Sequence, residues 1–312
     1  MMGTVQRCVV GAPASVVDDA PSTTLGKVGP VRPARRRTPG PRIALLMSLA
    51  LLTPTVWQPA DAAPPTSTAS TGTTATNATA PATDGTFFWA NAWAAHHTAA
   101  HGARSGAARM RRLVRLVVPA RVAVGALAEV ERSQVATFRR SAPSYRLLTG
   151  GRGDTTGVFW DAGAYDLVER YTFRSFTYGG RRLRVPVAVL RHRSTDRRLA
   201  VISVHNPRDR WRDRALGREL REVRRLRRAY AGRVSIFVAG DFNAGASVAC
   251  RAHRAGLVSV GNRGCRRYSP IDQLLVDRHV RVTGYRSISG GRVDRITDHP
   301  AVYRARFAIG GS

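Results

Sequence analysis

Residues 234–244 read VSIFVAGDFNA and place a cluster of polar groups directly after an apolar run. The β-branched segment 234–239 predicts a buried strand that runs into Gly240. In extended backbone, residues i and i+2 project to the same side, so Asp241 and Asn243 aim a carboxylate and a carboxamide at a common point. Phosphoryl chemistry needs this pairing, because the carboxylate orients water while the amide donates to an oxygen that gains negative charge. The stretch by itself suggests a phosphate-handling site at the end of a strand, and an ordinary turn is the alternative.

The sequence around this stretch alternates short apolar runs with one clear helical segment. Runs rich in β-branched residues, bounded by Gly, Pro or charged residues, occur at 121–125, 157–160, 185–190, 199–204 and 271–276. Such runs indicate strands. Residues 209–230 place Leu216, Leu220 and Val223 at helical spacing. Many strands with few helices predict an α+β fold with two packed sheets.

The charge of the chain is strongly positive. The 50 basic residues against 20 acidic ones give a net charge of +30, and Lys27 is the only lysine. A field of this sign concentrates polyanions and speeds their encounter with the protein. Near-total use of arginine is equally typical of codon bias in a GC-rich genome. The charge favours a phosphate-bearing substrate and leaves both explanations open.

The first 62 residues read as an export leader. A basic stretch at 32–42 is followed by the apolar run 43–52 and then by Ala60 and Ala62 at the spacing that a signal peptidase reads. This layout predicts a secretory signal and a secreted protein. The alternative is an uncleaved membrane anchor through residues 43–57, although that run is short for a bilayer.

Residues 63–84 predict a disordered linker, and residues 85–312 predict one catalytic domain. The linker is made of Ala, Thr, Pro and Ser without apolar periodicity, so it buries too little surface to offset the entropy of ordering it. Within the domain, Cys250 and Cys265 form an even pair, which an oxidising compartment would join as a disulfide. Two free thiols are the alternative.

Six short blocks follow one another along the predicted domain. They are 87–91 (FFWAN), 122–130 (VAVGALAEV), 201–205 (VISVH), 240–243 (GDFN), 271–275 (IDQLL) and 297–302 (TDHPAV). In this order the blocks resemble the endonuclease/exonuclease/phosphatase superfamily, which has an apolar strand followed by GDFN as its hallmark. The resemblance covers about residues 86–308. It implies a four-layer α/β/β/α sandwich of the deoxyribonuclease I-like type, with the active site at one edge.

The resemblance implies eight site residues. The catalytic ones are His205, Asp241, Asn243, Asp272 and His299, and the metal-binding ones are Glu129, Asn91 and Asp298. A hard carboxylate such as Glu129 fits Mg²⁺, which keeps several waters and needs one or two carboxylates; Mn²⁺ and Ca²⁺ are alternatives. Glu131 lies close enough in sequence to compete with Glu129. Asp272 is expected to orient His299 and raise its basicity.

The implied activity is hydrolysis of a phosphate ester by a secreted, metal-dependent enzyme that we expect to be monomeric. The arginine excess favours nucleic acid as the substrate, with endo- and exo-cleavage both open. Phospholipid and small-molecule esters are the alternatives within the same fold, although no apolar membrane-docking loop is evident. A hypothesis of a different class is a non-catalytic, wall-associated module that binds polyanions. We expect no stable membrane insertion after cleavage of the leader.

Overall fold

The computed structural model describes residues 82–97, 104–151, 153–176, 180–261, 265 and 270–310. The predicted leader and almost all of the predicted linker lie outside these residues. The described part begins earlier than the predicted domain boundary, because Thr83 and Asp84 already pair with Ile309 and Ala308 in a sheet. Among the described residues, no helix combines the length and apolar character needed to span a bilayer.

Within the described residues, twelve strands form two six-stranded mixed sheets. The first sheet has the order β11-β12-β1-β2-β4-β3. Its strands are β1 (Thr83–Asn91), β2 (Val124–Ala128), β3 (Tyr145–Thr149), β4 (Gly157–Asp161), β11 (Val280–Ile288) and β12 (Val302–Ile309). The strands β1 and β2 are parallel, and the other pairs in this sheet are antiparallel.

The second sheet has the order β5-β6-β7-β8-β10-β9. Its strands are β5 (Tyr165–Phe176), β6 (Arg182–His192), β7 (Arg198–His205), β8 (Val234–Asp241), β9 (Leu257–Ser259) and β10 (Asp272–Asp277). Here β7 and β8 are the parallel pair. The helices that accompany the sheets in the described part are α2 (Gly106–Val117), α3 (Arg132–Ser141), α4 (Arg212–Ala229) and α5 (Ala246–Arg254).

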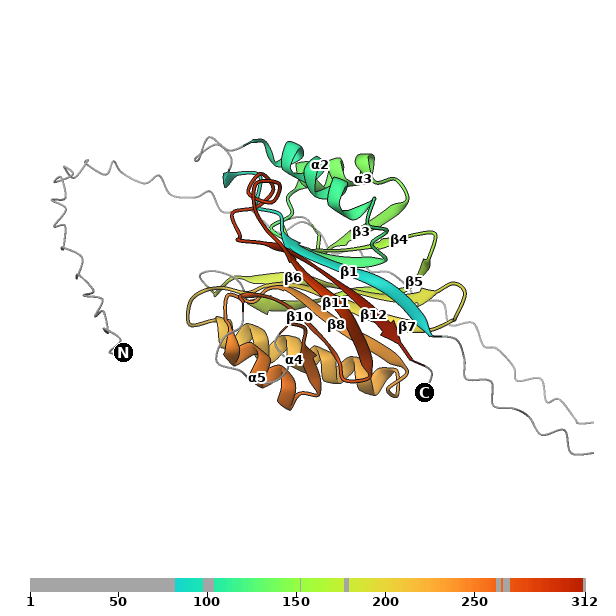
Figure 1. Ribbon diagram of the computed structural model, residues 1–312. Coiled ribbons are helices and arrows are strands. Elements are labelled where there is room, and N and C mark those ends of the chain that lie inside the picture. Colours follow the sequence, from blue (N-terminus) through green and yellow to red (C-terminus); the bar gives the residue numbers. More distant parts are fainter. Residues whose placement is uncertain are drawn as a thin grey trace, which may run out of the picture. The chain divides into compact units, whose positions relative to one another are not determined.

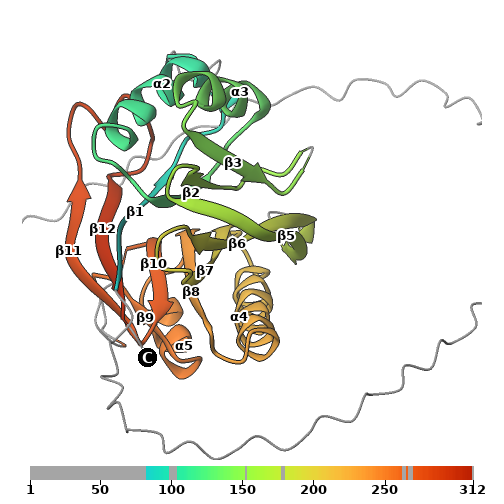
Figure 2. The ribbon, with the colours of Figure 1, turned by 90° about the vertical axis from the view of Figure 1, so that its right-hand side faces the viewer.

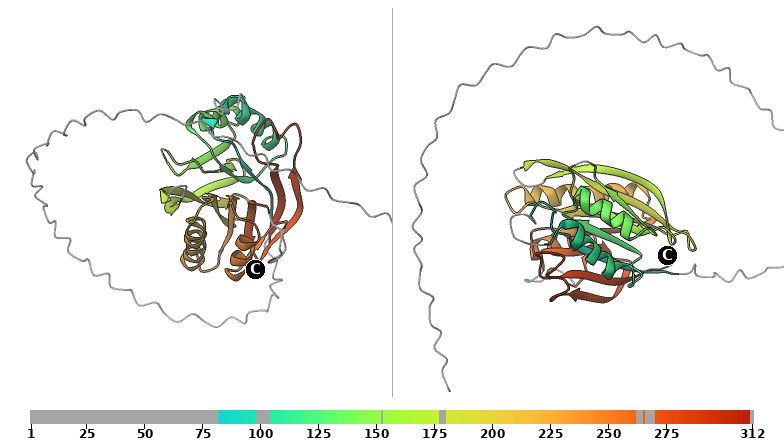
Figure 3. Two further views of the ribbon diagram at one scale, coloured as in Figure 1. Left: turned by 90° about the vertical axis from the view of Figure 1, so that its left-hand side faces the viewer. Right: turned by 90° about the horizontal axis from the view of Figure 1, so that it is seen from above.

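The elements stack in four layers. Figure 1 shows α2 and α3 over one sheet and α4 and α5 under the other, and the quarter turn in Figure 2 shows the two sheets face to face between them. Seen from above, α2 and α3 lie side by side over the first sheet (Figure 3). The predicted α+β, four-layer, deoxyribonuclease I-like sandwich is confirmed.

Three apolar clusters hold the layers together. Between the sheets, the Phe87 and Phe237 rings stack with centroids 5.4 Å apart, and the Phe307 ring packs 5.0 Å from Phe237. Leu216 and Val223 of α4 are buried against the second sheet, as their helical spacing predicts. The remaining cluster packs α2 and α3 on the first sheet. Burial at about 25 cal/mol per Å² of apolar surface makes these clusters the main stabilising contribution.

Candidate active site

Strand pairing brings the predicted site residues to one edge of the sandwich. In the first sheet, Asn91 ends β1 opposite Ala128, which ends β2, so Glu129 follows directly. In the second sheet, His205 pairs with Asp241, and Asp241 also pairs with Asp272 at the start of β10. Parallel strands end at the same edge, so groups that lie far apart in sequence meet there.

Two backbone positions shape this edge. Gly240 has φ 142°, and a Cβ there would lie 2.0 Å from the carbonyl oxygen of Val204, so β8 requires glycine at this point. Glu129 has φ 55°, a left-handed conformation that is rare for a residue with a side chain. Such strain is characteristic of functional sites. The left-handed conformation of Glu129 lies between the end of β2 and the start of α3.

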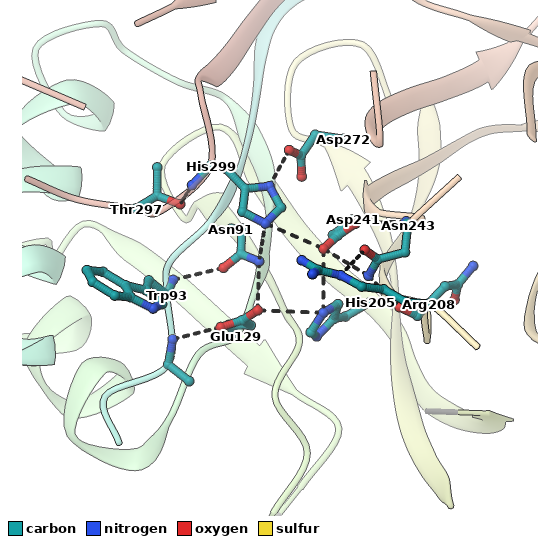
Figure 4. Close-up of polar contacts among 12 residues, drawn as sticks. Asn91, Trp93, Glu129, His205, Arg208, Asp241, Asn243, Asp272, Thr297 and His299 are labelled. Atoms are coloured by element: carbon teal, nitrogen blue, oxygen red, sulfur yellow. Dashed lines mark hydrogen bonds and ion pairs between the residues drawn. The ribbon is translucent and has the colours of Figure 1, made fainter. Parts of the chain in front are cut away.

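His299 and Asp272 form the best-defined contact of the site. The Nδ1 atom of His299 lies 2.5 Å from Oδ2 of Asp272, and both side chains are buried. The backbone N–H of His299 donates to Oγ1 of Thr297 at 3.0 Å, which fixes the loop before β12. The predicted orientation of His299 by Asp272 is present in the structure (Figure 4).

Asn91 links His299 to Glu129. Its Nδ2 atom lies 3.0 Å from Nε2 of His299 and donates to Oε1 of Glu129 at 2.9 Å. Its amide oxygen accepts the N–H of Trp93 at 2.8 Å. The second carboxylate oxygen of Glu129 accepts the N–H of Ala94 at 2.9 Å. In this arrangement Asn91 orients the Glu129 carboxylate, whereas the sequence predicts it as a metal ligand.

Asp241 lies at the centre of the cluster. Its Oδ2 atom is 3.6 Å from Nε2 of His299 and 3.5 Å from Nε2 of His205. The same nitrogen of His205 lies 3.6 Å from Oε1 of Glu129. Figure 4 shows these side chains pointing toward one another from both sheets. The structure thus brings seven of the eight predicted residues into one group, with Asp298 at its mouth.

Asn243 makes its side-chain contacts with groups of the protein around Asp241. Its Nδ2 atom donates to the carbonyl of Asn206 at 2.7 Å and to Oδ2 of Asp241 at 3.1 Å, while its Oδ1 atom accepts from Nε of Arg208 at 3.0 Å. The backbone N–H of Asn243 donates to Oδ1 of Asp241 at 2.8 Å. The amide therefore holds the Asp241 carboxylate in place.

Burial and neighbouring charges shift the pKa values of the cluster in opposite directions. Burial, with the nearby charge of Asp272, raises the pKa of Asp241 to about 7. Burial alone would lower the pKa of His299, but the hydrogen bond and charge of Asp272, with Asp241, raise it to about 9. Burial lowers the pKa of His205. Asp241 thus titrates near neutrality beside a cationic His299 and a neutral His205.

Glu129 remains a carboxylate at neutral pH. Burial would raise its pKa, but the positive charge that His205 carries when it is protonated, with the hydrogen bonds from Asn91 and the Ala94 N–H, more than offsets burial and lowers the pKa. An ionised carboxylate with one face toward a cavity is a donor that fits Mg²⁺. Asp241, Asp272 and His299 also bring ligand-type atoms within 4.8 Å of one another, but a cationic His299 paired with Asp272 has no lone pair for a metal. The donor set fits a divalent cation.

A cavity of about 900 Å³ opens beside this group. Glu129, His205 and the exposed Asp298 line it, together with Trp93, Arg181 and Arg208. The sequence reasoning missed the last three. In a chain with 50 basic residues, an arginine carries no positional signal, and Trp93 belongs to no predicted block.

Two further predictions concern neighbouring residues. Glu131 contacts His96 and is the N-cap residue before α3, where its backbone N–H donates to Oε1 of Gln134 at 3.0 Å. Glu129, and not Glu131, therefore lies in the cluster. Cys250 and Cys265 are joined in a disulfide with Cα atoms 4.4 Å apart, as predicted. The disulfide connects α5 to the segment before β10.

The sequence profile of the endonuclease/exonuclease/phosphatase family matches residues 88–299. This span contains the whole cluster from Asn91 to His299. The chain belongs to this family, whose members hydrolyse phosphate esters.

Solved structures of the same fold include proteins with different substrates. A family protein from Bacteroides thetaiotaomicron is 14% identical with a TM-score of 0.60, over 73% of this chain and 99% of its own. A mannosyl-6-phosphatase from the same organism is 14% identical with a TM-score of 0.55, over 71% and 98%. The D. rerio TDP2, complexed with a single-strand DNA product, is 15% identical with a TM-score of 0.55, over 72% and 98%. At these identities the likeness shows the fold alone. A search of curated protein sequences found no significant match.

Proposed function

We propose that the chain is an exported, Mg²⁺-dependent phosphodiesterase that hydrolyses nucleic acid. The observation that carries this proposal is the continuous set of contacts from Asp272 through His299, Asp241 and His205 to Glu129, with each separation at 3.6 Å or less. A base, a cation, a neutral imidazole and a metal-binding carboxylate at one open cavity are the groups that phosphate-ester hydrolysis requires.

In the proposed reaction, Asp241 positions the attacking water and accepts its proton. Its pKa of about 7 fits a base that works near neutral pH. His299, held cationic by Asp272, stabilises the negative charge that develops on the phosphate. His205 contacts a phosphate oxygen from the other side. A divalent cation bound by Glu129 would act as a Lewis acid on the phosphoryl group.

The positive charge of the cavity supports nucleic acid as the substrate. Arg181 and Arg208 line the cavity, and the chain as a whole carries a net charge of +30. Arginine presents a planar set of donors that matches phosphate oxygens. A small-molecule phosphomonoesterase is the second candidate, because a mannosyl-6-phosphatase has the same fold.

A substrate panel tests the proposal. Supercoiled plasmid, bis-p-nitrophenyl phosphate, p-nitrophenyl phosphate, mannose 6-phosphate and sphingomyelin are each incubated with Mg²⁺ and with EDTA. We expect nicking of plasmid and hydrolysis of the diester with Mg²⁺, and no turnover with EDTA. A His299→Ala preparation shows whether a contaminant is responsible. Hydrolysis of monoesters alone would replace the proposal with the second candidate, and binding of DNA without turnover of any ester would favour the non-catalytic module.

Export rests on the leader, with its basic stretch, apolar run and the small residues Ala60 and Ala62. Expression of the full chain in a bacterium with a general secretion system tests it. We expect a shortened protein in the culture medium whose N-terminus follows Ala62. The full-length chain in the membrane fraction would instead support an anchor through residues 43–57.

A further inference from the structure

Two aromatic rings stack next to the candidate active site. The ring of Phe176, which ends β5, and that of Trp211, which precedes α4, lie with centroids 4.9 Å apart and planes 18° from parallel. Gly180 makes room for this stack, because a Cβ there would lie 2.7 Å from the Trp211 ring.

Arginine side chains cover both rings. The guanidinium carbon of Arg218 lies 4.6 Å from the Phe176 ring centre, and that of Arg182 lies 5.5 Å from it. On Trp211, the corresponding distances are 4.7 Å for Arg214 and 5.4 Å for Arg210. We call these residues the arginine stack; its members are Phe176, Trp211, Arg182, Arg210, Arg214 and Arg218.

The arginine stack holds like charges close together. The pKa of Arg218 is lowered by desolvation and by the charges of Arg182 and Arg221. The acidic side chains of α4 form contacts elsewhere, since Asp213 pairs with Arg251 at 3.3 Å and Glu222 with Arg225 at 2.7 Å. Arg218 donates from Nη1 to the carbonyl oxygen of Arg174 at 2.9 Å, so its remaining N–H groups, with those of the other stacked guanidinium groups, are the ones that would meet phosphate oxygens.

The arginine stack adjoins the candidate active site, because Phe176 and His205 line one small cavity. Arg181, the neighbour of Arg182, lines the cavity, as does Arg208, two residues before Arg210. Arg208 donates to Oδ1 of Asn243 at 3.0 Å, and Asn243 in turn holds Asp241. Each of these two cavity arginines thus lies within two residues of an arginine that covers one of the rings.

We infer that the arginine stack binds the phosphates that flank the scissile one in a polynucleotide. It thereby gives the enzyme its preference for polynucleotides over small phosphate esters. This inference rests on the proposed function. A small diester occupies only the cavity, whereas a polynucleotide reaches the arginine stack as well.

The test compares two triple variants with the same change in charge. The first replaces Arg182, Arg214 and Arg218 by glutamine. The matched control also introduces glutamine, at the exposed residues Arg146, Arg254 and Arg281. These residues lie on β3, at the end of α5 and on β11. Binding of a fluorescein-labelled 30-nucleotide DNA is measured in EDTA by anisotropy at several salt concentrations. Turnover of DNA and of bis-p-nitrophenyl phosphate is measured with Mg²⁺.

We expect the first variant to bind DNA at least tenfold more weakly than the control, with a salt dependence that falls by roughly 0.7 units in log–log slope for each lost contact to a single strand. Its KM for DNA rises while its rate on the small diester stays within about twofold of the wild type. Equal losses of DNA binding in both variants would overturn the inference. The EDTA binding measurement keeps this outcome separate from a failure of the proposed function, which would show as absent turnover in the wild type.

Discussion

His299 lies with its Nδ1 atom 2.5 Å from Oδ2 of Asp272, and its other ring nitrogen faces Asn91 at 3.0 Å and Asp241 at 3.6 Å. One carboxylate therefore fixes the ring, and the other ring nitrogen points to the groups that would meet the substrate. The contact joins the loop before β12 in one sheet to β10 in the other. The site consequently depends on the packing of the two sheets.

Asp272→Asn tests this contact. Because the amide cannot stabilise a cationic ring as the carboxylate does, we expect the pKa of His299 to fall from about 9 toward its usual range. The measurement is an NMR titration of the His299 ring in EDTA. We also expect kcat on bis-p-nitrophenyl phosphate to fall about 10²–10⁴-fold. An unchanged pKa of His299 would contradict the claim that Asp272 stabilises the cationic ring.

Glu129→Gln tests the metal-binding carboxylate. The amide keeps the size of the side chain but removes the charge that attracts a divalent cation. We expect the Mg²⁺ concentration for half-maximal rate to rise at least about tenfold, with a smaller loss of rate at saturating metal. Glu131→Gln is the matched control, because Glu131 contacts His96 outside the cluster. If both variants changed the Mg²⁺ requirement equally, Glu129 would not be the specific metal ligand.

Glu219 makes stability depend on pH. This residue of α4 is buried and accepts from Nδ2 of Asn206 at 3.1 Å, and desolvation raises its pKa to about 7, opposed by the hydrogen bond from Asn206 and the charge of Arg251. The folded state therefore binds a proton more tightly than the unfolded state. The free energy of unfolding should fall as pH rises from about 4.5 to about 7, by on the order of 3 kcal/mol.

Urea titrations at pH 5 and pH 8 measure this effect. Glu219→Gln should reduce the difference between the two pH values and leave the part that Asp241 contributes, whereas Glu222→Gln on the same helix should keep the full difference because Glu219 is still present. A wild-type protein that becomes more stable between these pH values, together with a Glu219→Gln variant that shows the same difference, would show that Glu219 ionises freely.

The disulfide between Cys250 and Cys265 closes a loop of 15 residues. In the chain-entropy account, a loop of this length stabilises the folded state by about 3 kcal/mol. We expect Cys250→Ala with Cys265→Ala to lower the free energy of unfolding by about this amount and leave kcat nearly unchanged, because the loop lies outside the cluster. Addition of a reductant should destabilise the wild type and not the variant.

The sequence predicts the fold well where strands are central and apolar. The runs at 185–190, 199–204 and 234–239 fall within β6, β7 and β8, because strands covered on both faces are nearly continuous in apolar residues. The strands β3, β9 and the central β12 were missed, and so were β5 and β11. Both lie at sheet edges and carry exposed arginines and polar residues, so they show little of the apolar pattern. The run at 121–125 was placed three residues early, since Arg121 has φ 46° in the turn before β2.

For the candidate site, the sequence predicts which residues take part but not which groups they contact. Each of the eight residues stands in a block that marks a strand end or a loop, and pairing of the strands brings the blocks together. The hydrogen-bond partner of each side chain could not be predicted in the same way. Asn243 was expected to face a phosphate, but a nearby carbonyl and the Asp241 carboxylate take its amide protons. Such choices depend on which acceptor is nearest in three dimensions, and sequence spacing does not encode that distance.

The central claim is that Asp241 and His299 act on one phosphate group, and a double-mutant cycle tests it most directly. The rate of Mg²⁺-dependent hydrolysis of bis-p-nitrophenyl phosphate is measured for Asp241→Asn, His299→Ala and the double variant. Residues that act as a unit lose their effect together. We predict a loss of at least about 10³-fold for each single variant and nearly the same loss for the double. Single losses that multiply in the double variant, or rates equal to the wild type, would contradict the account.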